Sequence, residues 1–106
     1  MYNYETVFIL TPVLTEDQAT EVAGKFKNLL KELGAVITHD ERWGLKKLPI
    51  AINGKTTGYY YLFEYNSDGT AVAELERAFK RDERILRFTT ARLDPFGNKP
   101  VDSPVI

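Results

Sequence analysis

The sequence predicts an α+β domain: a split β-α-β sandwich with a four-stranded antiparallel sheet and two helices on one of its faces. The main observation is the spacing at which apolar residues recur along the chain. The spacing is typical of strands in some segments and of helices in others, in the order β-α-β-β-α-β. The length of 106 residues is typical of one domain. Because the chain has no cysteine, no disulfide framework contributes to this domain.

The first strand and the first helix are marked by their ends. Residues 4–10 are rich in β-branched and aromatic residues, and Thr11-Pro12 closes the run because proline lacks the N–H that a strand ladder needs. Thr15 and Gln18 match a capping box at the start of a helix. Apolar residues then recur every three or four positions until Gly34, which predicts the end of the helix.

A long hairpin is predicted next. Residues 36–40 and 45–52 form one long, interrupted strand in this interpretation, with Pro49 at an edge or a bulge because it cannot donate to a ladder. Asn53-Gly54 is the strongest short signal for a tight hairpin turn. Residues 59–65 are predicted to return as the third strand.

A second helix and a fourth strand complete the order. Residues 66–70 have turn chemistry, and Thr70 is the predicted N-cap of the helix that follows. Residues 85–93 predict the last strand. We expect the domain to span residues 1–96 and residues 97–106, rich in proline and polar residues, to be a loosely held tail.

The two faces of the predicted sheet differ in composition. Alternate residues of the third strand are all aromatic, so this side is expected to face the helices: Tyr59, Tyr61, Phe63 and Tyr65. The other face is expected to lack a cover, with charged residues around an apolar centre: Glu5, Arg87 and the four apolar residues Val7, Ile9, Tyr60 and Leu62. We interpret the four apolar residues as a docking surface for a partner. Ordinary exposed apolar residues on a small sheet are the alternative.

Residues with catalytic chemistry do not converge in this sequence. His39 is the only histidine, and the adjacent Asp40 and Glu41 point to opposite faces of a strand. No catalytic triad and no cluster of metal ligands is predicted, so we expect no enzyme activity, metal ion, cofactor or small-molecule substrate. The apolar runs are too short to span a bilayer, which favours a cytoplasmic protein without membrane contact.

The charge pattern bears on RNA binding. The formal net charge is −1, from 14 Lys and Arg against 15 Asp and Glu, so any RNA contact needs a local patch. The segment Trp43–Leu48 combines an aromatic residue with two cations, which suits a phosphate backbone and suits a solvated strand equally well. Gly58, Tyr59 and Tyr61 partly match the aromatic signature of the RNA recognition motif, but Glu64 replaces its last aromatic. A stand-alone single-stranded RNA-binding module is thus one alternative, and a non-RNA adaptor or homodimer another.

Several segments, in this order and spacing, resemble the bacterial small-subunit ribosomal protein S-six family over nearly the whole predicted domain. They are Tyr4-Glu5, Thr11-Pro12, Gly34-Ala35, Trp43–Leu48, Thr57–Tyr60, Arg81-Asp82, Arg84–Phe88 and Asp94–Phe96. One departure is Leu48-Pro49-Ile50-Ala51-Ile52, where the family usually follows its leucine with Ala-Tyr-Pro-Ile.

The resemblance implies a ferredoxin-like fold and a structural role in the small ribosomal subunit. It further implies binding to the central domain of small-subunit rRNA jointly with a second protein, ribosomal protein S-eighteen. By that analogy, six cations are candidates for contacts with RNA phosphates or acidic partner groups: Arg42, Lys46, Lys47, Arg81, Arg84 and Arg87.

Overall fold

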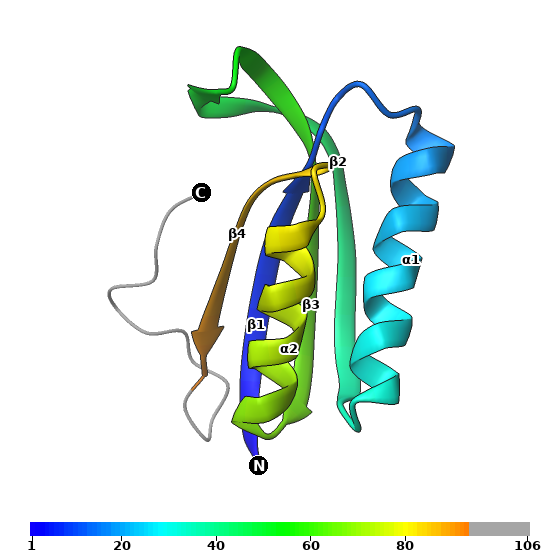
Figure 1. Cartoon of the computed structure of the whole chain (residues 1–106), viewed down its shortest axis with the longest axis vertical. Helices are drawn as coiled ribbons and strands as arrows, with labels where there is room; N and C mark the ends of the chain where they lie inside the picture. Colours follow the sequence, from blue (N-terminus) through cyan, green and yellow to red (C-terminus); the bar gives the residue numbers. More distant parts are fainter. Residues whose placement is uncertain (94–106) are drawn as a thin grey trace.

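The computed structural model describes residues 1–93 and shows two helices packed on one four-stranded antiparallel sheet (Figure 1). The sheet order is β2-β3-β1-β4, so β2 and β4 form its edges. This arrangement confirms the predicted fold class and element order. The elements are β1 (Tyr2–Leu10), α1 (Glu16–Glu32), β2 (Val36–Ile52), β3 (Lys55–Ser67), α2 (Gly69–Arg81) and β4 (Ile85–Arg92). The predicted tail lies outside the described residues.

The helix ends follow the local chemistry of the chain. Thr15 and Gln18 form the predicted capping box, in which each side chain accepts a hydrogen bond from the other residue's backbone N–H. Gly34 has a φ of +88°, the left-handed conformation that ends α1. The prediction of Thr70 as the second N-cap is wrong. The N-cap is Asp68, two residues before Thr70. Its carboxylate accepts a hydrogen bond from the Ala71 N–H.

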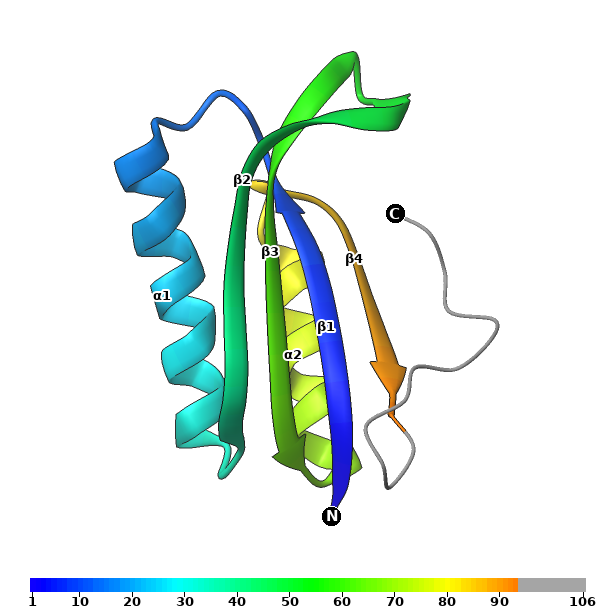
Figure 2. The ribbon, with the colours of Figure 1, turned by 180° about the vertical axis from the view of Figure 1, so that it is seen from behind.

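The end of the β2–β3 hairpin leans toward the side on which β4 lies (Figures 1 and 2). We call this part, from Lys46 through the Asn53-Gly54 turn to Thr57, the arm. Asn53 and Gly54 have φ values of 49° and 77°, as a two-residue hairpin turn requires. The β2–β3 register shifts three times, and the last shift, between Lys47 and Ile52, contains Pro49. Proline therefore lies on an edge strand at a break in the ladder, as predicted.

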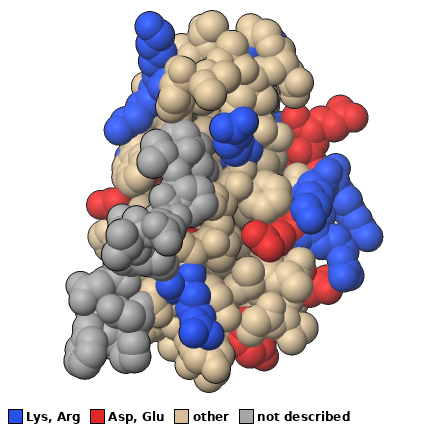
Figure 3. Space-filling model, turned by 90° about the vertical axis from the view of Figure 1, so that its left-hand side faces the viewer, with Lys and Arg blue, Asp and Glu red and all other residues tan. Residues whose placement is uncertain are grey.

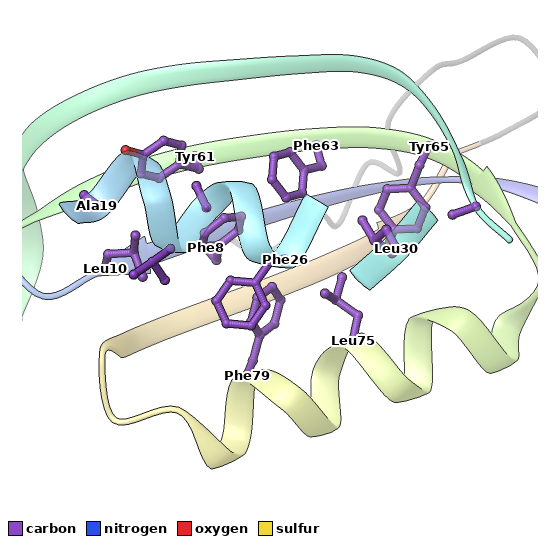
Figure 4. Close-up of a cluster of buried hydrophobic side chains, with 13 residues drawn as sticks. Phe8, Leu10, Ala19, Phe26, Leu30, Tyr61, Phe63, Tyr65, Leu75 and Phe79 are labelled. Carbon is purple, nitrogen blue, oxygen red and sulfur yellow. The ribbon is translucent and has the colours of Figure 1, made fainter. Parts of the chain in front are cut away.

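Aromatic rings fill the core between the sheet and the helices. Phe8 lies at its centre, with ring centroids 5.8 Å from Phe26, 5.5 Å from Tyr61, 5.2 Å from Phe63 and 5.1 Å from Phe79 (Figure 4). The aromatic side of β3 belongs to this core, which confirms that it faces the helices. Such ring pairs add about 0.5–1.5 kcal/mol each to the area they bury.

Two buried tyrosine hydroxyls in this core differ in their partners. The Tyr65 hydroxyl lies 2.8 Å from the Thr6 hydroxyl, which lies 2.9 Å from that of Thr90. Burial raises the pKa of Tyr65 to about 12. The buried Tyr61 hydroxyl has no hydrogen-bond partner among residues 1–93. A buried hydroxyl without a hydrogen-bond partner lowers the stability of the fold, whereas the hydrogen bond of the Tyr65 hydroxyl raises it.

The second face of the sheet is buried, so the expectation that it lacks a cover is wrong. Val7, Ile9, Tyr60 and Leu62 expose only 8%, 0%, 5% and 3% of their surface. They form a second cluster with Leu48, against which Ile52 and Leu86 pack, and we call these seven residues the second core. Leu48 and Ile52 belong to the arm. The cover therefore comes in part from the long hairpin, whose bend the residue pattern does not reveal.

Gly58 is required where the arm crosses this second core. A Cβ atom at residue 58 would lie 2.4 Å from Ile9 Cγ2 and 3.1 Å from the Leu10 carbonyl oxygen. The first contact is closer than atoms approach in folded proteins, and Ile9 is completely buried and has no room to move. The absence of a side chain at Gly58 thus allows β3 to lie close to β1.

Replacing Tyr65 with Phe is expected to lower the free energy of unfolding by about 1 kcal/mol, because a buried hydrogen bond is lost. Tyr61→Phe is the matched control: it removes a hydroxyl without a partner, so stability is expected to stay equal or to rise. Urea denaturation followed by circular dichroism measures both changes. Equal losses in the two variants would contradict this account of the hydroxyls.

Replacing Gly58 with Ala is expected to lower the free energy of unfolding by about 1–3 kcal/mol, because the new methyl group overpacks the site beside Ile9. Gly24→Ala is the control. Residue 24 lies in α1 with nothing within 4 Å of an added Cβ atom, and alanine there stabilises a helix by roughly 0.5–1 kcal/mol. Thermal melts of both variants test the assignment, and a stable Gly58→Ala protein would refute it.

Candidate nucleic-acid interface

The six cations predicted to contact RNA lie at separate places in the fold. Arg42 pairs in register with Tyr61 and so lies on the helix side of β2, whereas Arg87 pairs with Ile9 on the opposite face. Lys46 and Lys47 are consecutive residues of the arm and point to opposite faces. Arg81 ends α2, and Arg84 follows it in the loop before β4. On the β4 side of the molecule, Lys and Arg form separate groups with carboxylates between some of them (Figure 3).

Two of the six cations already have anionic partners. Arg42 Nη1 lies 3.6 Å from Glu16 Oε1 and 3.4 Å from Thr20 Oγ1, which links β2 to α1. Arg84 donates from Nε and Nη2 to the two carboxylate oxygens of Asp82, at 2.9 Å and 2.7 Å. The Arg84 hydrogen bond lowers the pKa of Asp82, and the same bond raises the pKa of Arg84. These guanidinium groups are therefore less available to a phosphate than the other four cations.

An aromatic pair lies at the base of the arm. The Trp43 ring stacks on the Tyr60 ring with centroids 6.1 Å apart and planes 21° apart. The Lys46 ammonium lies 5.0 Å from the centre of the Trp43 ring, and the indole N–H donates to Glu41 Oε2 at 3.0 Å. Trp43 remains 38% exposed. We call Trp43 and Tyr60, with Lys46, the aromatic platform.

Strand alternation places Trp43 on this face, because the preceding Arg42 lies on the helix side, and a β-bulge follows Trp43. Arg42 pairs with Tyr61 and Gly44 pairs with Tyr60, so two steps along β2 match one step along β3. Gly44 has a φ of +78°, a left-handed conformation that costs glycine little. The extra residue shifts the alternation of the residues that follow it, so that Lys46, which pairs with Gly58, lies on the same face as Tyr60 and Trp43.

Arg87 lies on the same face as the aromatic platform. Ile9 pairs with Tyr60 on one side and with Arg87 on the other, so these three residues form one row across the sheet. Burial raises the pKa of the Tyr60 hydroxyl, and the charge of Arg87 opposes this rise. The aromatic platform therefore has Lys46 above the indole, and Arg87 lies on the same face of the sheet.

The residues predicted to dock a partner lie beneath this surface. Val7, Ile9 and Leu62 are in the second core, and Tyr60 supports Trp43 from below. Their docking role stays a prediction, and in this structure they offer little surface to a partner. Three exposed apolar residues were not singled out from the sequence, although all lie on the edge strand β2: Val36, Leu45 and Ile50, with exposures of 60%, 56% and 69%.

Within residues 1–93, no group of three or more His, Cys, Asp or Glu side chains is arranged to hold a metal ion. His39 Nε2 lies 3.3 Å from Glu41 Oε1, and both side chains are about half exposed. In the same described range, neither helix combines the length and the apolar character needed to cross a bilayer.

Comparisons with known proteins agree on one family. The family model described as "Ribosomal protein S6" matches residues 3–92. The "Small ribosomal subunit protein bS6" of Parabacteroides distasonis is 54% identical over 97 residues, which cover 92% of this chain and 82% of that protein. The protein of the same name from Porphyromonas gingivalis is 53% identical over 97 residues, with coverages of 92% and 83%.

A solved structure gives the same result at the level of the fold. The crystal structure of 30S ribosomal protein S6 from Thermotoga maritima superposes with a TM-score of 0.82 at 27% sequence identity, and the match covers 86% of each chain. Residues 3–92, which the family model matches, include the aromatic platform and all six elements except the first residue of β1. The chain therefore belongs to the ribosomal protein S6 family of the small ribosomal subunit.

Proposed function

We propose that this protein is a structural, non-catalytic component of the cytoplasmic small ribosomal subunit, where it binds the central domain of small-subunit rRNA jointly with ribosomal protein S-eighteen. The observation that carries the proposal is the family match over residues 3–92, which spans the whole described fold. The proposed partners come from this family, and the structure supports them through its charges.

The charge arrangement favours binding as one half of a pair. The net charge is −1, and Arg42 and Arg84 are held by carboxylates of the same chain. The other four candidate cations, Lys46, Lys47, Arg81 and Arg87, form no ion pair with another described residue. Four separated cations release few counterions from RNA, so the protein alone should bind weakly. A basic partner protein would supply the remaining attraction.

The stand-alone RNA-binding alternative depends on Tyr59 and Tyr61 as base-stacking residues, and the structure does not support that role. Tyr61 is 4% exposed and stacks on Phe8 in the helix-side core. The Tyr59 hydroxyl donates to the Leu14 carbonyl oxygen at 3.0 Å, and its ring packs against the same core. Neither ring is open to a base. The partial match to the RNA recognition motif reflects helix-side packing.

The test is a titration of labelled central-domain rRNA with this protein, with and without S-eighteen, at two salt concentrations. We expect binding only with the partner, and weaker binding at the higher salt concentration. Equal binding of unstructured RNA by the protein alone would favour the stand-alone alternative. Self-association without any RNA binding would favour the adaptor or homodimer.

Replacing Lys47 with Gln is expected to weaken binding in the joint complex by a few fold and to lower the slope of log affinity against log salt by about 0.7–0.9, the effect of one lost phosphate contact. Lys31→Gln is the matched control, because Lys31 lies in the last turn of α1 outside the six candidates. An unchanged salt slope for Lys47→Gln would remove Lys47 from the interface.

A further inference from the structure

The Trp43 side chain is held in one orientation although it lies at the surface. Its inner face rests on Tyr60, its N–H is bonded to Glu41, and it still exposes 38% of its area. An indole that is fixed and partly exposed offers an ordered apolar plane. Little conformational entropy is then lost when another flat group stacks on it.

Covering the second core accounts for the inner face of the indole and not for its outer face. Tyr60, on which the indole stacks, is only 5% exposed, whereas Trp43 itself keeps 38% of its surface exposed. The outer face of the indole carries the Lys46 ammonium at 5.0 Å, a cation–π contact. At an exposed site such a contact contributes little, and the flexible lysine chain can move aside.

The charges around the indole favour a nucleotide over a segment of a basic protein. Lys46 lies over the Trp43 ring, and Arg87 lies in the same row as Tyr60, on the other side of Ile9. Positive charge at both places attracts phosphates and repels lysine and arginine side chains. The Glu41 carboxylate accepts the hydrogen bond from the indole N–H at the edge of the ring. The face of the ring therefore carries the Lys46 cation, and Arg87 adds positive charge on the same face of the sheet.

We propose that the aromatic platform binds an unpaired nucleotide of the RNA: the base stacks on the outer face of Trp43, and Lys46 and Arg87 contact the adjoining phosphates. Stacking on an aromatic side chain is the usual way in which proteins hold unpaired RNA bases. The inference rests on the proposed function, because it names the part of the RNA and the residue that holds it. It adds an aromatic contact to an interface otherwise composed of cations.

Trp43 is the only tryptophan of the chain, so its fluorescence reports on this site alone. The experiment uses the full-length protein with S-eighteen whose tryptophans are replaced by phenylalanine. Central-domain rRNA is titrated into this complex while fluorescence is followed, and affinity is measured separately by filter binding. We expect RNA to quench the indole emission over the same concentration range as binding. This readout needs no substitution in the protein.

Variants separate stacking from charge. Trp43→Leu is expected to weaken RNA binding roughly 10- to 100-fold without a change in salt slope, whereas Trp43→Phe retains most of the affinity. Lys46→Gln should lower the salt slope by about 0.7. Leu45→Ala, on the same strand and 56% exposed, is the control and should bind as the original protein does. Circular dichroism melts confirm that each variant is folded.

The outcomes distinguish this inference from the function on which it rests. If RNA binds with unchanged emission and folded Trp43→Leu binds equally well, the platform is not a base-stacking site, although the proposed function stands. If S-eighteen alone changes the emission and RNA adds nothing, the platform contacts protein, and the inference is also overturned. If the original complex does not bind RNA at all, both proposals fail.

Discussion

The structure depends on one constraint: the two central strands are apolar on both faces. Successive side chains of a strand alternate between faces. Along β3, Tyr61 and Phe63 therefore lie against the helices while Tyr60 and Leu62 lie on the other side, and β1 repeats the pattern. An antiparallel sheet of this kind usually leaves one face to water, with polar residues there. Here both faces need a cover, and the two helices provide only one.

The length and shape of the β2–β3 arm follow from that need. Leu48 and Ile52 reach the second core only because the hairpin extends beyond the sheet and bends. The bulge before Gly44 and the register break around Pro49 interrupt a strand that would otherwise be straight and flat. The same bulge brings Lys46 to the face on which Trp43 stacks on Tyr60. The surface that we propose for RNA is thus a product of the way in which the second core is closed, and both depend on the same hairpin.

Local patterns predicted most of the fold, while features set by distant contacts were missed. The capping box at Thr15, the turn at Asn53-Gly54 and the aromatic side of β3 depend on neighbouring residues, and all three are confirmed. The cover of the second face depends on the bend of the arm, which no short spacing specifies. A bulge also shifts the register by one residue, so counting alternate positions fails after Trp43. The ion pair of Arg42 with Glu16 also depends on a distant contact, because it forms only where α1 packs against β2.

The positions of the cations limit the kind of RNA surface that this protein can meet. Lys46 and Lys47 are adjacent in a strand and project to opposite faces of the arm, so a flat surface on one side reaches only one of them. Arg87 lies on the Lys46 side, whereas Arg42 lies on the helix side and is held by Glu16. A regular RNA helix packed on one face would therefore leave much of the positive charge unused. An irregular RNA with an unpaired base near Trp43, and phosphates on both sides of the arm, would use more of these groups.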